Sequence, residues 1–177
     1  MAAADPGPID MSNSGSIELM RADAALVTDD ELEGLLWAVY VQGGFTDSDL
    51  AATLFAAPAV RARGELIVAR DAADGRSIGM VIIVDPWSLA RRLAEPDEAE
   101  MHLLAVVASD RGRGVGGRLV GAAQSAAKAR GFSRMVLWTQ PTMHAAHRLY
   151  ERNGFSRAEH RDWQRGDRTF LVFQKAL

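Results

Sequence analysis

The stretch from Ala99 to Ala129 constrains the fold of this chain more than any other. A short apolar run leads into the glycine- and arginine-rich segment 111–117, after which apolar residues repeat at helical spacing. This order predicts a strand, a loop and a helix. Glycines at the junction let backbone N–H groups turn toward an anion, and the free N–H groups and dipole of the helix start favour phosphate. Arg111 and Arg113 add positive charge there, so we expect a nucleotide-like ligand at this loop.

Two phosphate-binding patterns can be fitted to the loop, and they predict different functions. Residues 112–117 match G-x-G-x-x-G, the dinucleotide fingerprint. That pattern also needs an acidic residue near the end of the next strand to hold a ribose, but this strand ends in Leu-Trp-Thr-Gln. Only about sixty residues follow the loop, too few for the second half of a doubly wound sheet. The other pattern, R-x-x-G-x-G, is formed by residues 111–116.

The second pattern resembles the pyrophosphate loop of the GCN5-related N-acetyltransferase (GNAT) family. Ala99-Glu100 followed by Leu104–Val106 is similar to the family's fourth strand, and Arg148–Phe155 is similar to its late helix and turn. The order of splayed strand, loop, helix, fifth strand and tyrosine-bearing helix is also the family's. The likeness is close over residues 98–175 and extends in outline to residues 16–85. It implies an α/β (α+β) fold with a mixed, largely antiparallel central sheet flanked by helices.

The resemblance implies acetyl-CoA as the co-substrate. The edge of the central strand would pair through its backbone with the pantetheine arm, and Gly116 would leave space for the pyrophosphate. The family often carries an asparagine seven residues before its tyrosine, where this chain has Met143. The residues implied to bind the coenzyme are Leu104, Ala105, Val106, Val107, Arg111, Gly112, Arg113, Gly114, Val115, Gly116, Gly117, Arg118, Ala146 and Tyr150.

Acetyl transfer to an amine needs a deprotonated amine and an acid for the departing thiolate. Freeing the lone pair of a lysine-like amine at pH 7 costs roughly 4.6 kcal/mol, so a base helps. By resemblance Glu100 is that base, and we expect burial to raise its pKa toward neutrality. Strand alternation places Glu98 and His102 on the same face as Glu100, so either could serve instead. Tyr150 matches the family's tyrosine, which protonates the leaving thiolate.

Composition narrows the remaining function classes. The 177 residues carry a formal charge of −3, which argues against general attraction to nucleic acid or to an anionic membrane. No apolar run approaches the ~20 residues of a spanning helix, and the N-terminus does not resemble a signal peptide, so we expect a cytoplasmic protein. We expect a loose tail over residues 1–15 and one domain over residues 16–177. His144 and His147 lie one helical turn apart without a third ligand nearby, so no metal site is expected.

Apolar periodicity and turn residues outline the other elements. The long acidic connection 86–98 is either a solvated loop or a segment that attracts a cationic acceptor. Pro58 should kink or end the helix in which it lies. We expect strands at Ile17–Met20, Glu65–Arg70, Ile78–Asp85, Ser133–Thr139, Phe155–Gln164 and Arg168–Lys175, and helices after a Thr28 cap, over Leu50–Val60, and from a Thr142 cap to Asn153.

These features predict an N-acetyltransferase that acetylates a primary amine by direct transfer from acetyl-CoA in a ternary complex. The chain has no cysteine, which removes the commonest covalent intermediate. A non-catalytic acyl-CoA-binding sensor is the alternative from another class, and it would bind acetyl-CoA without turnover. We expect the acceptor to be a small molecule rather than a protein, although the regions that form its pocket carry no motif.

Overall fold

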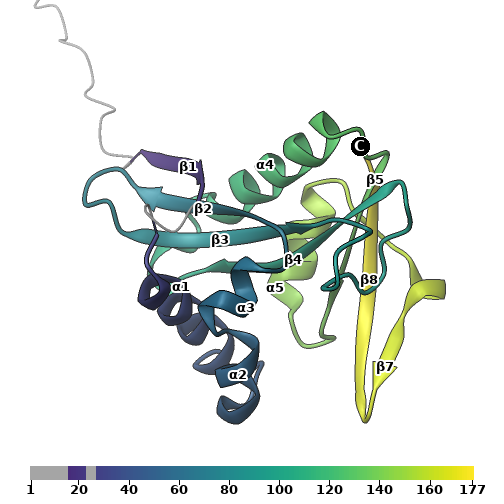
Figure 1. Cartoon of the computed structure of the whole chain (residues 1–177), viewed down its shortest axis with the longest axis horizontal. Coiled ribbons are helices and arrows are strands. Elements are labelled where there is room, and N and C mark those ends of the chain that lie inside the picture. The colour runs from purple at the N-terminus through teal and green to yellow at the C-terminus, as the bar shows by residue number, and fades with distance from the viewer. Residues whose placement is uncertain (1–15, 23–26) are drawn as a thin grey trace, which may run out of the picture.

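The computed structural model describes residues 16–22 and 27–177, and the predicted N-terminal tail lies outside these residues. The described chain contains both helices and strands (Figure 1). A π-helical turn, Trp37–Val41, extends the first helix. The elements are β1 (Ile17–Arg21), α1 (Asp29–Leu36), α2 (Ser48–Leu54), α3 (Ala57–Arg61), β2 (Glu65–Asp71), β3 (Ser77–Val84), β4 (Glu98–Val106), α4 (Val115–Ala129), β5 (Arg134–Thr139), α5 (His144–Arg152), β6 (Ser156–Arg157), β7 (Trp163–Arg165) and β8 (Arg168–Ala176).

The strands form one mixed sheet in the order β1-β2-β3-β4-β5-β8-β6, and β7 also pairs with β8. Only β4 and β5 run parallel, while the other pairs are antiparallel. The helix α4 supplies the crossover that a parallel neighbour requires. The predicted α/β fold with a largely antiparallel sheet is therefore confirmed.

Helices cover both faces of the sheet (Figure 1). On one face, Val115, Leu119 and Ala123 of α4 pack against β-branched residues of β2 and β3, and Tyr150 of α5 joins this cluster. On the other face, Leu32 and Leu36 of α1 pack against the opposite side of the same strands. Because β2 and β3 are buried on both sides, their sequences are largely continuous apolar runs and do not alternate between apolar and polar residues.

Strand β4 bends in the middle, and this bend creates the space for the site. Leu103 has a positive φ of 47°, and the register between β3 and β4 shifts at this point. A bulge of this kind bends the strand that carries it. Strand β4 pairs with β5 only from Glu98 to Met101, so its second half has β3 on one side and an open edge on the other.

Three local predictions are wrong. The predicted helix Leu50–Val60 is not one helix: α2 ends at Leu54, before Pro58, and Pro58 lies in the first turn of α3, where its missing N–H costs nothing. Met143, not Thr142, precedes the first residue of α5. The predicted strand Phe155–Gln164 is divided by a 3-10 turn at Glu159–Arg161, because Arg161 turns inward to pair with the buried carboxylate of Glu98.

No helix in residues 16–22 or 27–177 is long and apolar enough to cross a membrane.

Candidate active site

Along the open edge of β4, every second residue directs its backbone N–H and C=O groups away from β3. The Val107 amide donates to Ile78 of β3, so the backbone groups of Leu104 and Val106 face away from β3. The Leu104 carbonyl accepts a hydrogen bond from the Tyr40 hydroxyl at 3.1 Å, and the Val106 carbonyl accepts one from Arg111 Nε at 3.2 Å. These carbonyls are held by side chains, so a ligand amide could replace either donor without disturbing the sheet.

The loop between β4 and α4 has the backbone shape that its glycines permit. Gly112 and Gly114 have φ values of 83° and 81°, which a residue with a Cβ adopts only at a cost. Gly114 is the N-cap of α4. The amides of Val115, Gly116 and Gly117 donate no hydrogen bond to another described residue, as expected for the first turn of a helix. An anion at this point would meet free N–H groups and the positive end of the helix dipole.

The arginines of this loop differ in their surroundings. Arg111 and Arg118 are exposed, and Arg111 leans back onto β4. Arg113 is instead ion-paired with Asp71 at 2.8 Å and with Asp110. The hydrogen bonds that Arg113 donates to these two carboxylates raise its pKa. The positive charge predicted for Arg113 at the pyrophosphate is therefore largely offset within the protein.

Gly116 has a packing role that differs from the predicted one. A Cβ at this position would lie 2.9 Å from Cδ2 of Leu149 and 3.7 Å from Cγ2 of Val106. The missing side chain therefore makes room for α5 and β4. We expected a side chain at Gly116 to enter the pyrophosphate space, but this is wrong, because a Cβ there would point toward Leu149 and Val106. The loop positions whose backbone conformation requires glycine are Gly112 and Gly114.

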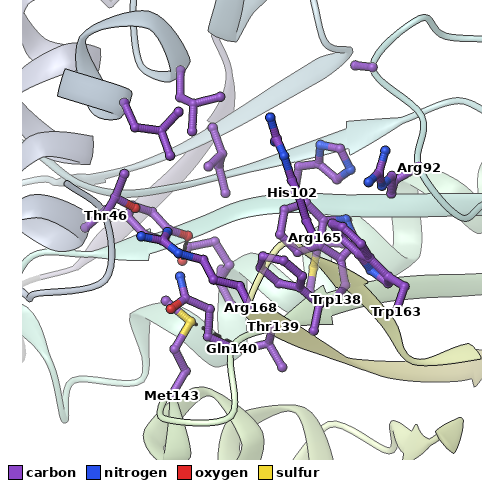
Figure 2. Close-up of a pocket in the computed structure, with 18 of the residues that line it drawn as sticks. Thr46, Arg92, His102, Trp138, Thr139, Gln140, Met143, Trp163, Arg165 and Arg168 are labelled. Atoms are coloured by element: carbon purple, nitrogen blue, oxygen red, sulfur yellow. Dashed lines mark hydrogen bonds between the residues drawn. The ribbon is translucent and has the colours of Figure 1, made fainter. Parts of the chain in front are cut away.

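A cavity of about 520 Å³ opens where β4 and β5 separate (Figure 2). Its walls include Leu103 and Leu104 of β4, Trp138 of β5 and residues of the β7–β8 hairpin. Tyr150 of α5 also lines it. The ring of Tyr150 packs against Phe173 with centroids 5.7 Å apart, whereas its hydroxyl has no hydrogen-bond partner among the described residues. Burial raises the pKa of Tyr150, so its hydroxyl keeps its proton at neutral pH.

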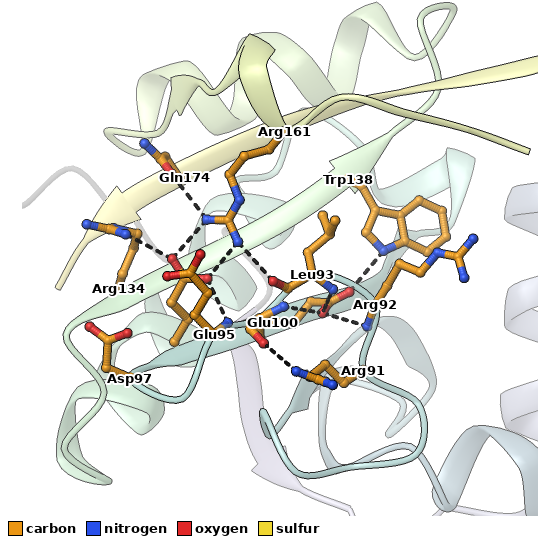
Figure 3. A network of polar contacts seen from close by, with 12 residues as sticks. Arg91, Arg92, Leu93, Glu95, Asp97, Glu100, Arg134, Trp138, Arg161 and Gln174 are labelled. Atoms are coloured by element: carbon orange, nitrogen blue, oxygen red, sulfur yellow. Dashed lines mark hydrogen bonds and ion pairs between the residues drawn. The ribbon is translucent and has the colours of Figure 1, made fainter.

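Glu100 is fully buried and accepts five hydrogen bonds. Figure 3 shows Glu100 beside Leu93, Arg92 and Trp138. Its Oε2 accepts from the backbone amides of Arg92, Leu93 and Ala94 at 2.9, 2.8 and 3.0 Å. Its Oε1 accepts from Trp138 Nε1 at 3.0 Å and lies 2.6 Å from His102 Nε2.

These contacts keep Glu100 ionised. Burial alone would raise its pKa, but the hydrogen bond and charge of His102, together with the amides of Leu93 and Arg92, outweigh burial and lower the pKa to about 2. The predicted upward shift is wrong because strand alternation says nothing about the loop that wraps around the carboxylate. A carboxylate with so low a pKa is a weak base at neutral pH.

His102 is the member of this pair that lines the cavity. Because an ionised carboxylate can only accept, His102 Nε2 carries the proton that it shares with Glu100. Its Nδ1 is buried and has no hydrogen-bond partner among the described residues. The imidazole is thus oriented by a carboxylate on one side and retains an unused nitrogen on the other.

Glu98 has different partners from Glu100, and two of them, Arg134 and Arg161, are labelled in Figure 3. Arg134 lies 3.0 Å from its Oε1, and Arg161 contacts both of its oxygens at 2.9 and 2.8 Å. Burial opposes ionisation, but these arginines and the Glu95 amide lower the pKa of Glu98. Glu98 does not line the cavity and joins β4, β5 and the Glu159–Arg161 turn.

Residues 29–155, more than half of the chain, match the sequence model of the acetyltransferase (GNAT) family. The chain belongs to the GNAT family. A comparison with curated protein sequences found no significant match. Many solved structures share the fold of this GNAT chain.

Three GNAT structures illustrate this similarity. A GNAT-family acetyltransferase from Staphylococcus aureus has a TM-score of 0.71 and 12% identity, covering 92% of this chain and 99% of its own. The PaiA N-acetyltransferase from Thermoplasma acidophilum, solved with coenzyme A, has a TM-score of 0.70 and 16% identity over 92% and 99%. The ribosomal-protein-S18-alanine N-acetyltransferase from Escherichia coli has a TM-score of 0.65 and 17% identity over 91% and 94%.

The GNAT motifs did not indicate the acceptor side of the cavity. Its walls include Tyr40 from the π-helical turn, Arg63 before β2, Arg92 from the β3–β4 connection and Trp163 from β7. None belongs to a sequence pattern. The aromatic side chain of Trp163 was one available signal, since it could either line an acceptor pocket or pack in the core. The length of the 86–98 connection was another, and we associated it with acidic rather than basic chemistry.

The acidic residues of that connection do not reach the cavity. Glu95, Asp97 and Glu98 are absent from its walls, whereas Arg92 forms part of them. The alternative that this segment attracts a cationic acceptor is therefore not supported by the arrangement of its charges. His144 and His147, where we expected no metal site, stack edge to face at 5.9 Å, and the described residues contain no group of three or more potential ligands.

Proposed function

We propose that this GNAT protein transfers an acetyl group from acetyl-CoA to a primary amine, directly and within a ternary complex. One observation carries the proposal. The open edge of β4, the unpartnered hydroxyl of Tyr150 and the Glu100–His102 pair meet around one cavity. A strand edge, a proton donor and an oriented proton acceptor are what a direct transfer between a thioester and an amine requires.

The coenzyme side of the proposed site runs along one continuous segment. The carbonyls of Leu104 and Val106 would accept hydrogen bonds from the pantetheine amides. The amides of Val115, Gly116 and Gly117 would hold the pyrophosphate, with Arg111 and Arg118 nearby as exposed cations. The other predicted coenzyme contacts lie around these groups. The backbones of Ala105 and Val107 face β3. The turn is shaped by Gly112, Arg113 and Gly114, and Ala146 lies on α5.

In this proposal His102 accepts the proton of the attacking amine, and Glu100 acts through it. The carboxylate fixes the tautomer and orientation of the imidazole and stabilises the imidazolium that forms. Of the candidates Glu98, Glu100 and His102, only His102 lines the cavity. Tyr150 donates a proton to the sulfur when the thiolate leaves, a role for which a raised pKa is suitable.

The test is release of free thiol from acetyl-CoA, measured with a panel of primary amines of differing charge and size. We expect amine-dependent thiol release together with a mass increase of one acetyl group on the amine. Calorimetric titration with acetyl-CoA provides the second readout. Binding of acetyl-CoA without turnover on any amine would support the alternative, a non-catalytic acyl-CoA sensor. Failure to bind acetyl-CoA would contradict both functions.

A further inference from the structure

The charged residues around the cavity are mostly cationic. Four arginines, Arg63, Arg92, Arg165 and Arg168, line it against a single carboxylate, Asp167. Figure 2 shows Arg92, Arg165 and Arg168 approaching the cavity from the β3–β4 connection and the β7–β8 hairpin. The chain as a whole has a formal charge of −3, so the charge around the cavity is opposite in sign to the net charge of the chain.

Three of these arginines, Arg63, Arg92 and Arg165, have no carboxylate partner among the described residues, and Arg63 is the least exposed of the three. Among the described residues, no Asp or Glu lies within ion-pairing distance of Arg63 or Arg92, whereas Arg168 pairs with Asp47 at 2.7 Å. Arg63 is half-buried, and within the described part of the chain its guanidinium donates only to the Leu54 carbonyl, at 2.8 Å. Burial lowers the pKa of Arg63, which reflects the cost of a desolvated charge. An anionic ligand in the cavity would offset this cost.

Arg92 stands at the end of a row of aromatic rings that begins at His102. His102 and Trp138 lie 5.8 Å apart, Trp138 and Trp163 lie 5.4 Å apart, and the Arg92 guanidinium lies 4.1 Å above Trp163. Phe170 stacks on Trp163 at 4.2 Å. The buried Nε1 of Trp163 is a further donor without a partner among the described residues.

The unpaired arginines are separate from the phosphate-binding part of the site. No residue of the loop 111–117 lines this cavity. The proposed pyrophosphate position lies at the start of α4, beyond the open edge of β4. The positive charge around the cavity is therefore available to the acceptor.

We propose that the acceptor is an aromatic primary amine that also carries a carboxylate, and that Arg63 and Arg92 bind this carboxylate. This inference rests on the proposed acetyltransferase function. The amine would lie toward His102, the ring against Trp138 and Trp163, and the carboxylate against the guanidinium groups, which suit it through paired N–H donors.

The test compares three amines that share a phenyl ring: phenylalanine, phenylalaninamide and phenethylamine. In the Arg63→Gln/Arg92→Gln double variant we expect kcat/KM for phenylalanine to fall by about 10- to 100-fold, the usual effect of losing a charge-assisted hydrogen bond. The kcat/KM values for phenylalaninamide and phenethylamine, which have no carboxylate, should change by less than about threefold. Since each comparison uses one substrate with two proteins, differences in amine basicity cancel. The Arg63→Lys and Arg92→Lys variants should retain part of the preference.

The matched control is Arg91→Gln, which removes the same charge from the same connection but lies outside the cavity walls. It should leave the three substrates in the wild-type order. An equal loss for all three substrates in the double variant, or no loss for phenylalanine, would overturn the inference. Thermal unfolding of the double variant and the lysine variants excludes a general loss of structure.

Calorimetric titration with N-acetylphenylalanine and N-acetylphenylalaninamide separates this inference from the proposed function, because it requires no turnover. We expect the wild-type protein to bind the carboxylate-bearing product more tightly, and the double variant to lose that difference. Equal binding of the two compounds by the wild-type protein would contradict the carboxylate site even if amines are acetylated. A preserved difference without any acetylation would contradict only the proposed function.

Discussion

The two sides of the proposed site are built in different ways. The coenzyme side comes from one continuous segment, residues 104–118, and its hydrogen-bonding groups are mainly backbone amides and carbonyls. The acceptor side is assembled from segments as distant as Tyr40 and Phe170, and its chemistry lies in side chains. Backbone groups can be placed by local conformation, whereas side chains from distant segments can meet only after the sheet has formed.

This difference determines which changes should affect which side. On the coenzyme side, the sensitive positions are those where the backbone needs a left-handed conformation. On the acceptor side, they are buried polar groups whose partners come from other elements. Four substitutions test the comparison, from the largest expected effect to the smallest.

His102→Ala should lower kcat by about 1000-fold, within the range for loss of a general base, while acetyl-CoA affinity stays unchanged. A higher pH should partly restore the rate because it supplies free amine. Steady-state kinetics from pH 6 to about 10 provide the measurement. His160→Ala, an exposed histidine outside the cavity, is the control. A normal rate in His102→Ala would remove this residue from the mechanism.

Glu100→Gln should change how stability depends on pH. The folded-state pKa of Glu100 is lowered to about 2, so its ionised form stabilises the fold above the ordinary pKa near ~4.3. That contribution is lost as the pH falls through the folded-state value. The free energy of unfolding should differ between wild type and variant by a constant amount above pH ~5, and the difference should shrink by up to about 3 kcal/mol toward pH 2.

Urea unfolding at steps from pH 7 to about 3 measures this difference. The exposed Glu151→Gln variant is the matched control for removal of one negative charge. A wild-type-to-variant difference that stays constant across the acid range would show that Glu100 is not held in its ionised form by the fold.

Tyr150→Phe should lower kcat by about 100-fold through loss of a proton donor. The free energy of unfolding should change by less than about 1 kcal/mol, because the ring packing remains and the hydroxyl has no partner to lose. Single-turnover thiol release and thermal unfolding measure the two effects. A large loss of stability with normal kcat would identify Tyr150 as a packing residue.

Gly114→Ala should weaken acetyl-CoA binding by about tenfold, since a Cβ in the left-handed region costs roughly 1–2 kcal/mol and shifts the start of α4. Gly121→Ala is the matched control, because Gly121 lies in the same helix with open space around it and no positive φ. Calorimetric titration compares the two variants. Equal affinities would mean that the loop conformation does not control coenzyme binding.

The sequence predicted most of the fold because each element carries a local signal. Thr28 is the predicted N-cap of α1, where it forms a capping box with Glu31, and Gly112 and Gly114 of the loop have positive φ values. Predictions failed where a tertiary contact overrode local preference. Arg161 interrupts a strand-like sequence to reach Glu98, a partner 63 residues away.

The sequence by itself determined the family, the sheet and the position of the glycine-rich loop, because glycine conformations, helix starts and strand periodicity depend on neighbouring residues. Only the tertiary structure decided the state of Glu100 and the charge of the cavity. The low pKa of Glu100 depends on amides 92–94 and on Trp138, which the fold of the β3–β4 connection and of β5 brings together around one carboxylate. The same holds for Arg63 and Arg92. Whether an arginine has a carboxylate partner depends on the residues that surround it in space, and these are known only from the tertiary structure.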